Sequence, residues 1–360
     1  MNPEFKPWRN SVTFGDALTI LTQIPDKMVS CTVTSPPYYG LRTYLADDNP
    51  DKQYEMGSEE SPEEYIKKLV MVFQEVRRVT RDDGLLWLNL GDSYSKKGLL
   101  QIPVKVAIAL QEDGWYLRQD IILAKSNCMP SSVTDRFTSS YEHMFMFSKS
   151  KNYYFKQQFE PLASPNAKSK NATNKHAGYG NPQYSGFSYD AKDYPLGRNK
   201  RDVWHVTTKG YKGAHFAVFN PEWIRPCIQA GCPTEICDIC DEPVRFIIEK
   251  GEPLREWQKS CGGDQNGNYT GENTKDYASA KAQPASDLKR RVLEGLCVKK
   301  QVRNPCDCEN ATFQPGIVLD PFLGSGTTAM VAAQEKCQFA GIELNTEYVQ
   351  IILDRINSAR

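Results

Sequence analysis

Short apolar runs, each bounded by turn residues, recur along the chain and predict the strands of a buried sheet. One of these runs, Val29 to Thr34, stops at Ser35-Pro36-Pro37, because two adjacent prolines cannot join a central ladder. Further strands are predicted near residue 11 and at 84–90, 115–125, 143–149, 317–319 and 339–344. Because helical patterns separate several of these runs, the chain is predicted to form an α/β fold.

The clearest helix signal begins at Ser61. Ser61-Pro62-Glu63-Glu64 is a capping box with proline at the first helical position, and an apolar face follows at Tyr65, Leu69, Val72, Val76 and Val79. We therefore expect this helix to cover the sheet. Other helices are predicted at 103–113, from Pro221, at 327–334 and from Gln350 to the end of the chain. The run His143 to Lys149 is expected to pair with Tyr153 to Phe155 as a hairpin at the sheet edge.

A glycine turn lies between a strand and a helix near the end of the chain. Ile317 to Leu319 is the strand, Gly324-x-Gly326-x-x-Ala329 supplies the turn and the helix start, and a second strand ends on Glu343. Glu343 follows the turn by about 20 residues, the distance at which a carboxylate meets a ribose hydroxyl in nucleotide-binding βαβ units. An ordinary strand-to-helix turn and a dinucleotide site are the alternatives, and a P-loop is excluded because no Gly-Lys-Ser/Thr follows.

Asp320 ends the first of these strands and puts a carboxylate beside the turn. A carboxylate suits a cationic cofactor without phosphate groups better than it suits a pyrophosphate, and S-adenosylmethionine fits that description. A unit of this kind normally opens a doubly wound fold, but here it comes last. The other strands of the sheet must therefore come from upstream.

Composition sets limits on the protein class. The 360 residues give room for one large α/β domain with an insertion, or for two domains. Lys and Arg together number 44, and Asp and Glu together also number 44. Because these charges cancel over the whole chain, a basic surface that binds nucleic acid has to be a local feature. Neither an apolar run of about 18 residues nor a signal-peptide core is present, which predicts a soluble, cytoplasmic protein without a membrane partner.

Residues 151–215 differ in composition from the rest of the chain. Lys and Arg outnumber Asp and Glu there, and Tyr, Phe and Trp are interleaved with Asn, Ser and Gly. Cations interleaved with aromatic residues suit phosphate contacts and base stacking, so this stretch is a candidate DNA-facing loop. A solvated linker with no partner is the alternative.

Two cysteine pairs lie in a stretch of about 80 residues between Pro233 and Gly316. They are Cys237-Asp-Ile-Cys240 and Cys306-Asp-Cys308, and two such pairs brought together can bind one structural zinc ion. Cys261 and Cys297 are alternative ligands, while Cys227 and Cys232 are expected to pack in the preceding helix. Free thiols and disulfides remain alternatives. No Glu or His accompanies either pair, which disfavours a catalytic metal.

The segment Ser35-Pro36-Pro37-Tyr38 is the candidate catalytic group. Methylating an exocyclic amino group requires acceptors that hold its N–H groups while the nitrogen becomes pyramidal. The Ser35 side chain and the Pro36 carbonyl are two such acceptors, the prolines fix their direction, and Tyr38 can stack on a flipped base. A rigid proline turn without catalytic function is the alternative.

Thr34-Ser-Pro-Pro-Tyr38 together with Asp320-Pro-Phe-Leu-Gly-Ser-Gly-Thr-Thr328 closely resembles the amino-group DNA methyltransferases, in the motif order called beta. Segments at 15–18, 89–92, 201–204 and 215–233 are similar to the same family. The resemblance implies a Rossmann-like, S-adenosylmethionine-dependent methyltransferase fold with permuted motif order and a cysteine-containing insertion. It divides the chain into a catalytic half at 11–155, a basic and aromatic region at 156–213, a cofactor-binding half at 214–233 and 315–360, and an insertion at 234–314.

The resemblance also implies roles for single residues. Ser35 to Tyr38 correspond to the catalytic tetrapeptide, and Glu343 is expected at the cofactor ribose. The predicted contacts to the rest of the cofactor and its pocket are Asp320, Pro321, Phe322, Gly324, Ser325, Gly326, Thr327, His215 and Phe219. Serine in the first position of the tetrapeptide is more typical of N4-cytosine enzymes than of N6-adenine enzymes, which usually carry Asp or Asn there.

We therefore expect a site-specific methyltransferase that flips a base out of double-stranded DNA, with N4 of cytosine as the preferred target and N6 of adenine as the alternative. A cognate restriction endonuclease is a candidate partner, and one or both of the regions at 156–213 and 234–314 are expected to recognise the target. An RNA methyltransferase and an inactive DNA-binding zinc protein are the competing hypotheses. A nicotinamide oxidoreductase is disfavoured because no hydride-handling residue lies near the glycine turn.

Overall fold

The structure is a computed structural model that describes residues 8–41, 43–161, 196–207, 219–253 and 297–359. The described residues fall into two compact units. The first unit takes in those within 1–158, 201–245 and 305–360, and the second those within 159–200 and 246–304. The larger first unit contains both of the sequence motifs singled out above.

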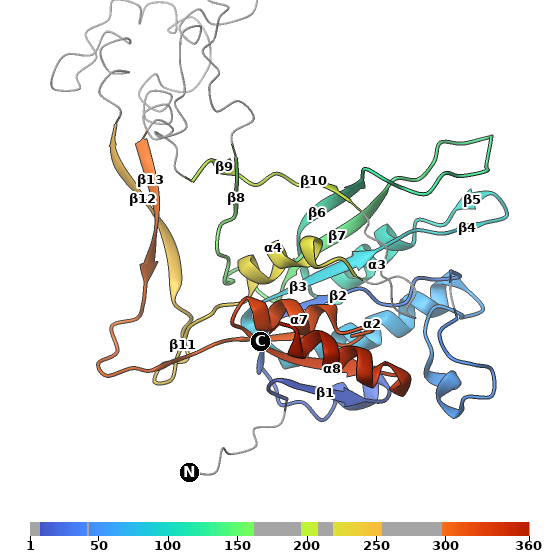
Figure 1. Ribbon diagram of the computed structural model, residues 1–360, viewed down its shortest axis with the longest axis horizontal. Coiled ribbons are helices and arrows are strands. Elements are labelled where there is room, and N and C mark those ends of the chain that lie inside the picture. The colour runs from blue at the N-terminus through green and yellow to red at the C-terminus, as the bar shows by residue number, and fades with distance from the viewer. Residues whose placement is uncertain (1–7, 42, 162–195, 208–218, 254–296, 360) are drawn as a thin grey trace, which may run out of the picture. The chain divides into compact units, whose positions relative to one another are not determined.

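The first unit is built on an eight-stranded sheet with the order β1-β16-β15-β2-β3-β7-β6-β10 (Figure 1). Its strands are β1 (Ser11–Phe14), β16 (Gln338–Glu343), β15 (Ile317–Asp320), β2 (Val29–Thr34), β3 (Thr80–Leu90), β7 (Tyr141–Ser148), β6 (Tyr116–Lys125) and β10 (Val203–Val206). Neighbouring strands from β1 to β3 are parallel, and β10 is parallel to β6. Strand β7 is antiparallel to both of its neighbours.

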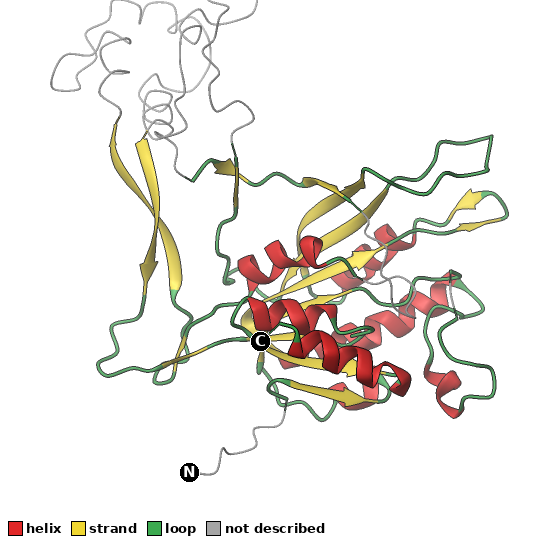
Figure 2. Ribbon diagram, in the orientation of Figure 1, coloured by secondary structure: helices red, strands yellow, loops and turns green. Residues whose placement is uncertain are grey.

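Helices cover both faces of this sheet (Figure 2). Residues of α1 (Ala17–Leu21), α2 (Pro62–Val79) and α3 (Ile102–Glu112) pack in one hydrophobic cluster, and residues of α4 (Pro221–Gly231), α7 (Thr327–Gln334) and α8 (Val349–Asn357) pack in the other. Strand β3 contributes to both clusters, with Leu86, Leu88 and Leu90 on one side and Leu85 and Trp87 on the other. This alternation is the two-residue period of a strand buried on both faces. The predicted α/β, Rossmann-like fold is confirmed.

The α2 helix shows why local sequence signals placed the elements well. Ser61 caps it by accepting a hydrogen bond from the Glu64 backbone N–H at 3.2 Å, and Pro62 occupies the first turn. The predicted apolar face is buried in the first cluster. The helices predicted at 103–113, from Pro221 and at 327–334 are present within one residue of their expected starts.

The predicted pairing of His143–Lys149 with Tyr153–Phe155 is wrong. Strand β7 lies inside the sheet between β3 and β6, and Met144 to Phe147 are buried. A strand so apolar is stable only with neighbours on both sides. Residues 153–155 are not a strand, and the Tyr154 N–H donates to the Asp83 carbonyl at 2.8 Å.

Short elements complete the described chain. They are the 3-10 turns η1 (Pro50–Tyr54) and η5 (Thr346–Tyr348), and the strand pairs β4 (Tyr94–Ser95) with β5 (Gly98–Leu99) and β11 (Ile236–Cys237) with β14 (Phe313–Gln314). In the second unit, β8 (Phe159–Glu160) pairs with β9 (Arg198–Asn199), and β12 (Arg245–Pro253) with β13 (Cys297–Asn304). None of the described helices combines the length and apolar character that crossing a membrane requires.

Candidate active site

The two motifs lie side by side because their strands are neighbours. Strands β15 and β2 are parallel, with Val318 opposite Cys31 and Leu319 opposite Thr32. The glycine turn after β15 and the Ser35 segment after β2 therefore leave the sheet at the same edge. In open α/β sheets, this carboxyl edge is where ligands bind.

Asp320 fastens the two strand ends to each other and to α7. Its Oδ1 accepts from the Thr34 hydroxyl at 2.6 Å and from the Phe322 N–H at 3.0 Å, and its Oδ2 accepts from the Thr328 hydroxyl at 2.7 Å. The side chain is 2% exposed, and burial raises its pKa to about 6 despite these three donors. Asp320 does not line the cavity described below, and its three hydrogen bonds hold the turn in place.

The turn itself depends on two glycines. Gly324 has a φ of 55° and Gly326 a φ of 82°, in the left-handed region that favours glycine. A Cβ at Gly326 would also lie 3.3 Å from the Ile352 Cα, so the backbone of α8 packs closely against the turn. The Ser325 hydroxyl accepts from Arg355 Nη1 at 2.5 Å on the same side. Contacts from α8 therefore hold the turn in place.

Glu343 closes the turn from the end of β16. Its Oε2 accepts from the Gly324 N–H at 2.6 Å, and its Oε1 accepts from the Asn345 N–H at 2.8 Å. Burial raises the pKa of Glu343 to about 7. Each carboxylate oxygen keeps a further acceptor position, so the side chain can receive hydroxyl groups from a ligand.

A cavity with an empty volume of about 800 Å³, including the part open to solvent, lies at this edge of the sheet. The predicted residues that line it are Ser35, Pro37, Pro321, Phe322, Gly324 and Glu343. Residues that the sequence did not single out as contacts also line it: Gly15, Asp16, Ala17, Tyr44, Leu45, Tyr54, Glu55, Met56, Leu344, Asn345 and Tyr348.

Among these additional lining residues, two segments differ in how far the sequence indicated them. Gly15 to Ala17 follow β1, and β1 is parallel to β16, which brings this turn to the cavity. The family resemblance marked the same turn but gave it no role. The loop from Tyr44 to Met56 carries no motif, and it is organised by Glu55, which accepts from the Tyr44 and Leu45 N–H groups, the latter at 3.0 Å.

Ser35 is held by a hydrogen-bonded network. Its hydroxyl lies 3.2 Å from Asn89 Oδ1. The Asn89 amide is oriented by its own Nδ2, which donates to the His143 carbonyl at 2.9 Å and to Glu142 Oε2 at 3.2 Å. The Ser35 hydroxyl also lies 3.3 Å from the Tyr38 hydroxyl, so its proton is donated to Asn89 Oδ1 or to Tyr38, and in either case the lone pairs of Ser35 remain to accept a hydrogen bond.

Tyr38 belongs to the same network through its hydroxyl. That oxygen lies 2.9 Å from Asn89 Oδ1 and 3.0 Å from Glu142 Oε2, and Glu142 forms an ion pair with Lys125. Burial raises the pKa of Tyr38, so its hydroxyl stays protonated and donates. A Cβ at Gly91 would lie 2.6 Å from the Tyr38 ring, which shows how closely the ring packs on that backbone.

The remaining predicted residues occupy other places. Pro36 is buried and does not line the cavity, and Ser325 and Thr327 are buried at the start of α7, also without lining it. The Pro37 carbonyl accepts from the Tyr65 hydroxyl at 2.8 Å. Phe219 packs against the second hydrophobic cluster and does not line the cavity, and His215 lies outside the described residues.

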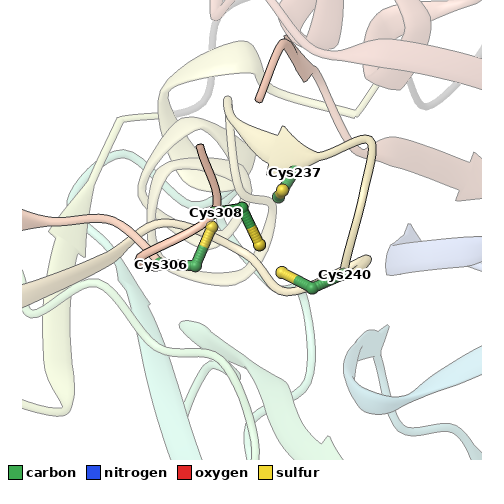
Figure 3. Close-up of side chains that lie close together, drawn as sticks. All are labelled: Cys237, Cys240, Cys306 and Cys308. Carbon is green, nitrogen blue, oxygen red and sulfur yellow. The ribbon is translucent and has the colours of Figure 1, made fainter. Parts of the chain in front are cut away.

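The four cysteines proposed as metal ligands do come together (Figure 3). The Sγ atoms of Cys237, Cys240, Cys306 and Cys308 all lie within 4.8 Å of one another. Cys227 is buried within α4 and Cys232 at its end, as expected. Cys261 lies outside the described residues.

Known proteins resemble the chain over nearly its whole length. A family model described as DNA methylase matches residues 29–237 and 308–354. The chain is 33% identical to the type II methyltransferase M.XycI of Xanthomonas campestris pv. cyanopsidis, over 99% of this chain and 91% of that protein. It is also 33% identical to the type II methyltransferase M.Cfr9I of Citrobacter freundii, over 95% of this chain and 86% of that protein.

Among solved structures, the chain is similar to the PvuII DNA methyltransferase (cytosine-N4-specific). The TM-score is 0.54 at 14% identity, covering 96% of this chain and 86% of that one. At this identity the likeness concerns the fold.

Proposed function

Since this chain belongs to the DNA methylase family of N6- and N4-amino methyltransferases, we propose that it transfers a methyl group from S-adenosylmethionine to N4 of cytosine in double-stranded DNA. The observation that carries the proposal is the place of Ser35. Ser35 lines the cavity that Glu343 and the glycine turn also line, and its hydroxyl donates to Asn89 or Tyr38, which leaves its lone pairs as acceptors.

The polar and apolar groups of the cavity suit S-adenosylmethionine, the methyl donor. The proposed ribose acceptor is Glu343, whose two oxygens are oriented by the Gly324 and Asn345 N–H groups. Phe322 and Pro321 supply apolar walls beside the turn. When bound, S-adenosylmethionine supplies an electrophilic methyl group on a positively charged sulfur.

The protein's part in the reaction is to orient the base. We propose that the Ser35 lone pairs and the Pro36 carbonyl accept the two N–H groups of the flipped base, with Tyr38 stacked on its ring. The amine nitrogen then becomes pyramidal, and its lone pair attacks the methyl carbon as the bond to sulfur breaks. The nitrogen sheds one N–H proton to solvent only as the methyl group arrives, so no strong base is required.

The proposal of cytosine N4 rests on Ser35 itself. Serine in the first position of the tetrapeptide is the residue that the family resemblance associates with N4-cytosine enzymes, and adenine N6 is the second candidate. Sequencing the genomic DNA of an expression host by a method that distinguishes the two modified bases tests this. N4-methylcytosine at one recurring short sequence is expected. N6-methyladenine there would contradict the base assignment, and unmodified DNA would contradict the function.

Tyr38→Phe is expected to slow methyl transfer several-fold and to lower the free energy of unfolding by roughly 1–2 kcal/mol. Phe keeps the ring but leaves Asn89 Oδ1 and Glu142 Oε2 without the donor that Tyr38 provides. Single-turnover kinetics and denaturant unfolding measure the two effects. Tyr39→Phe is the matched control, because no described residue forms a hydrogen bond with the Tyr39 hydroxyl. Equal rates and stabilities for the two variants would show that the Tyr38 hydroxyl is dispensable.

We further propose that one or both of the regions at 156–213 and 234–314 recognise the DNA target. Most of 156–213 and the centre of 234–314 lie outside the described residues. The matched ranges of the family model leave out 238–307, as expected of a part that differs between members with different targets. The relatives are named type II methyltransferases, so we propose a cognate endonuclease as partner and the cytoplasm, where its DNA lies, as the place of action.

Deleting residues 165–195 is expected to flatten the salt dependence of DNA binding. The deleted stretch carries an excess of Lys and Arg, and the slope of log affinity against log salt falls by about one unit for each phosphate that the protein ceases to bind. The deletion leaves Phe159–Glu160 and Arg198–Asn199, which pair as β8 and β9. Titrating duplex DNA at several salt concentrations gives the slope. An unchanged slope would indicate that residues 165–195 are a linker and that the insertion at 234–314 recognises the DNA.

A further inference from the structure

Four thiols from two distant parts of the chain meet at one point of the first unit. Cys237 and Cys240 flank a tight turn after β11, and Cys306 and Cys308 precede β14 (Figure 3). A tetrahedral zinc ion with Zn–S bonds of about 2.3 Å holds its sulfurs about 3.8 Å apart. The observed limit of 4.8 Å for all four Sγ atoms is close to that spacing.

We propose that Cys237, Cys240, Cys306 and Cys308 bind one structural zinc ion, which closes the base of the inserted segment 241–305. The ligand set consists of four sulfurs, the set typical of structural zinc. Four thiolates fill a tetrahedral site and leave no position for water. None of the four residues lines the cavity at the glycine turn, so the ion has no place in methyl transfer.

The backbone around the cysteines is already shaped for a metal. The Ile239 N–H points at Cys237 Sγ, with a nitrogen–sulfur distance of 3.4 Å, and the Asp241 N–H donates to the Cys237 carbonyl at 3.1 Å. An N–H group directed at a sulfur stabilises the thiolate form that binds zinc. Asp241 and Asn310 have left-handed φ values of 59° and 58°, which turn the chain just after each cysteine pair. Both pairs are therefore presented on tight turns.

The two cysteine turns are fastened to each other beside the proposed ion. Asp238 Oδ1 accepts from the Thr312 N–H at 2.9 Å, and the Asp238 N–H donates to the Thr312 carbonyl at 3.0 Å. Arg81, at the start of β3, pairs with the Asp241 carboxylate at 2.6 Å. The turn that carries Cys237 and Cys240 is therefore bonded to strand β3 of the main sheet.

The role follows from what lies between the ligands in the chain. The segment from Asp241 to Pro305 leaves the first unit just after one cysteine pair and returns just before the other. Strand pairings join the two ends of this segment as β12 with β13 and, at the cysteines themselves, as β11 with β14, which has two residue pairs. So short a ladder is weak on its own, whereas zinc bound by four thiolates contributes folding free energy directly. The ion thus fixes both ends of the insertion.

Elemental analysis of the full-length protein, purified without chelators, tests the site directly. One zinc per chain is expected, and Cys306→Ser with Cys308→Ser in one chain should lose it. The control is Cys128→Ser, which removes a cysteine outside the cluster and should keep the zinc. Cobalt(II) in place of zinc should give the absorption of tetrahedral thiolate ligation. Zinc-free protein, iron in place of zinc, or full zinc content in the double variant would each overturn the assignment.

The role of the ion is tested by removing it with a chelator and mapping the cuts made by a protease. Faster cleavage confined to 241–305 is expected, with S-adenosylmethionine affinity unchanged, because the cavity residues belong to other elements. An unchanged cleavage pattern in zinc-free protein would contradict the closing role. These readouts do not depend on methyl transfer, so the zinc site and the proposed activity can fail separately.

Discussion

Ser35→Ala is expected to lower the single-turnover rate of methyl transfer by about 30-fold to 1,000-fold, the ~2 to 4 kcal/mol that one oriented hydrogen-bonding group contributes in other enzymes. The variant removes the acceptor that is proposed to hold the amine, and it leaves Glu343 and the glycine turn untouched. Cofactor affinity should therefore change little. Rapid-quench kinetics with labelled S-adenosylmethionine and calorimetry measure the two quantities.

Ser30→Ala is the matched control for this variant. Ser30 lies on β2, the strand that Ser35 follows, its hydroxyl is buried without a partner among the described residues, and it does not line the cavity. The same atom is removed in each case, but only Ser35 faces the proposed base. If Ser35→Ala reacted as fast as Ser30→Ala, orientation by Ser35 would not be the source of the rate.

Glu343→Ala is expected to weaken S-adenosylmethionine binding by about 30-fold to 1,000-fold, or roughly 2 to 4 kcal/mol, because hydrogen bonds to a charged group contribute ~1.5–3 kcal/mol each. The variant also leaves the Gly324 and Asn345 N–H groups without their acceptor. Calorimetric titration gives the affinity, and Glu347→Gln, which changes an exposed neighbouring carboxylate, is the control. Unchanged affinity in Glu343→Ala would remove this residue from the cofactor site.

The same carboxylate predicts a pH dependence. Its pKa in the folded protein, about 7, lies above the ordinary value of 4.5, so ionisation costs folding stability as pH rises between these values, on the order of 3 kcal/mol in total. The proposed ribose contact uses the ionised form as acceptor, so we expect affinity for S-adenosylmethionine to fall about tenfold per pH unit below 7. Glu343→Gln should bind weakly with no such dependence, because its amide keeps one acceptor oxygen and does not titrate.

Sequence signals predicted single elements well because their causes are local. The Ser61 cap, the apolar face of α2 and the glycine turn at Gly324 each depend on residues within one or two turns of chain. The adjacency of the two motifs was inferred from strand polarity, and the neighbouring positions of β15 and β2 account for it. Both cysteine pairs were visible as pairs, and the structure brings them together.

Other parts of the site depend on contacts that no local pattern encodes. The position of β7 inside the sheet is decided by which strands it joins. Asn89 is far from Ser35 in sequence, and its role appears only when β3 lies beside β2. Asp320 stays a predicted cofactor residue, and no local pattern indicates that its oxygens accept from Thr34, Thr328 and the Phe322 backbone.

Nucleoside analysis of duplex DNA methylated by the purified protein tests the central claim most directly. The DNA is incubated with S-adenosylmethionine carrying a labelled methyl group, digested to nucleosides and separated by chromatography with mass detection. The account predicts the label in N4-methyldeoxycytidine, and a rate of labelling about 30-fold to 1,000-fold lower when Ser35→Ala replaces the parent under single-turnover conditions. Label in C5-methyldeoxycytidine, or no label in DNA while the protein binds S-adenosylmethionine, would contradict it.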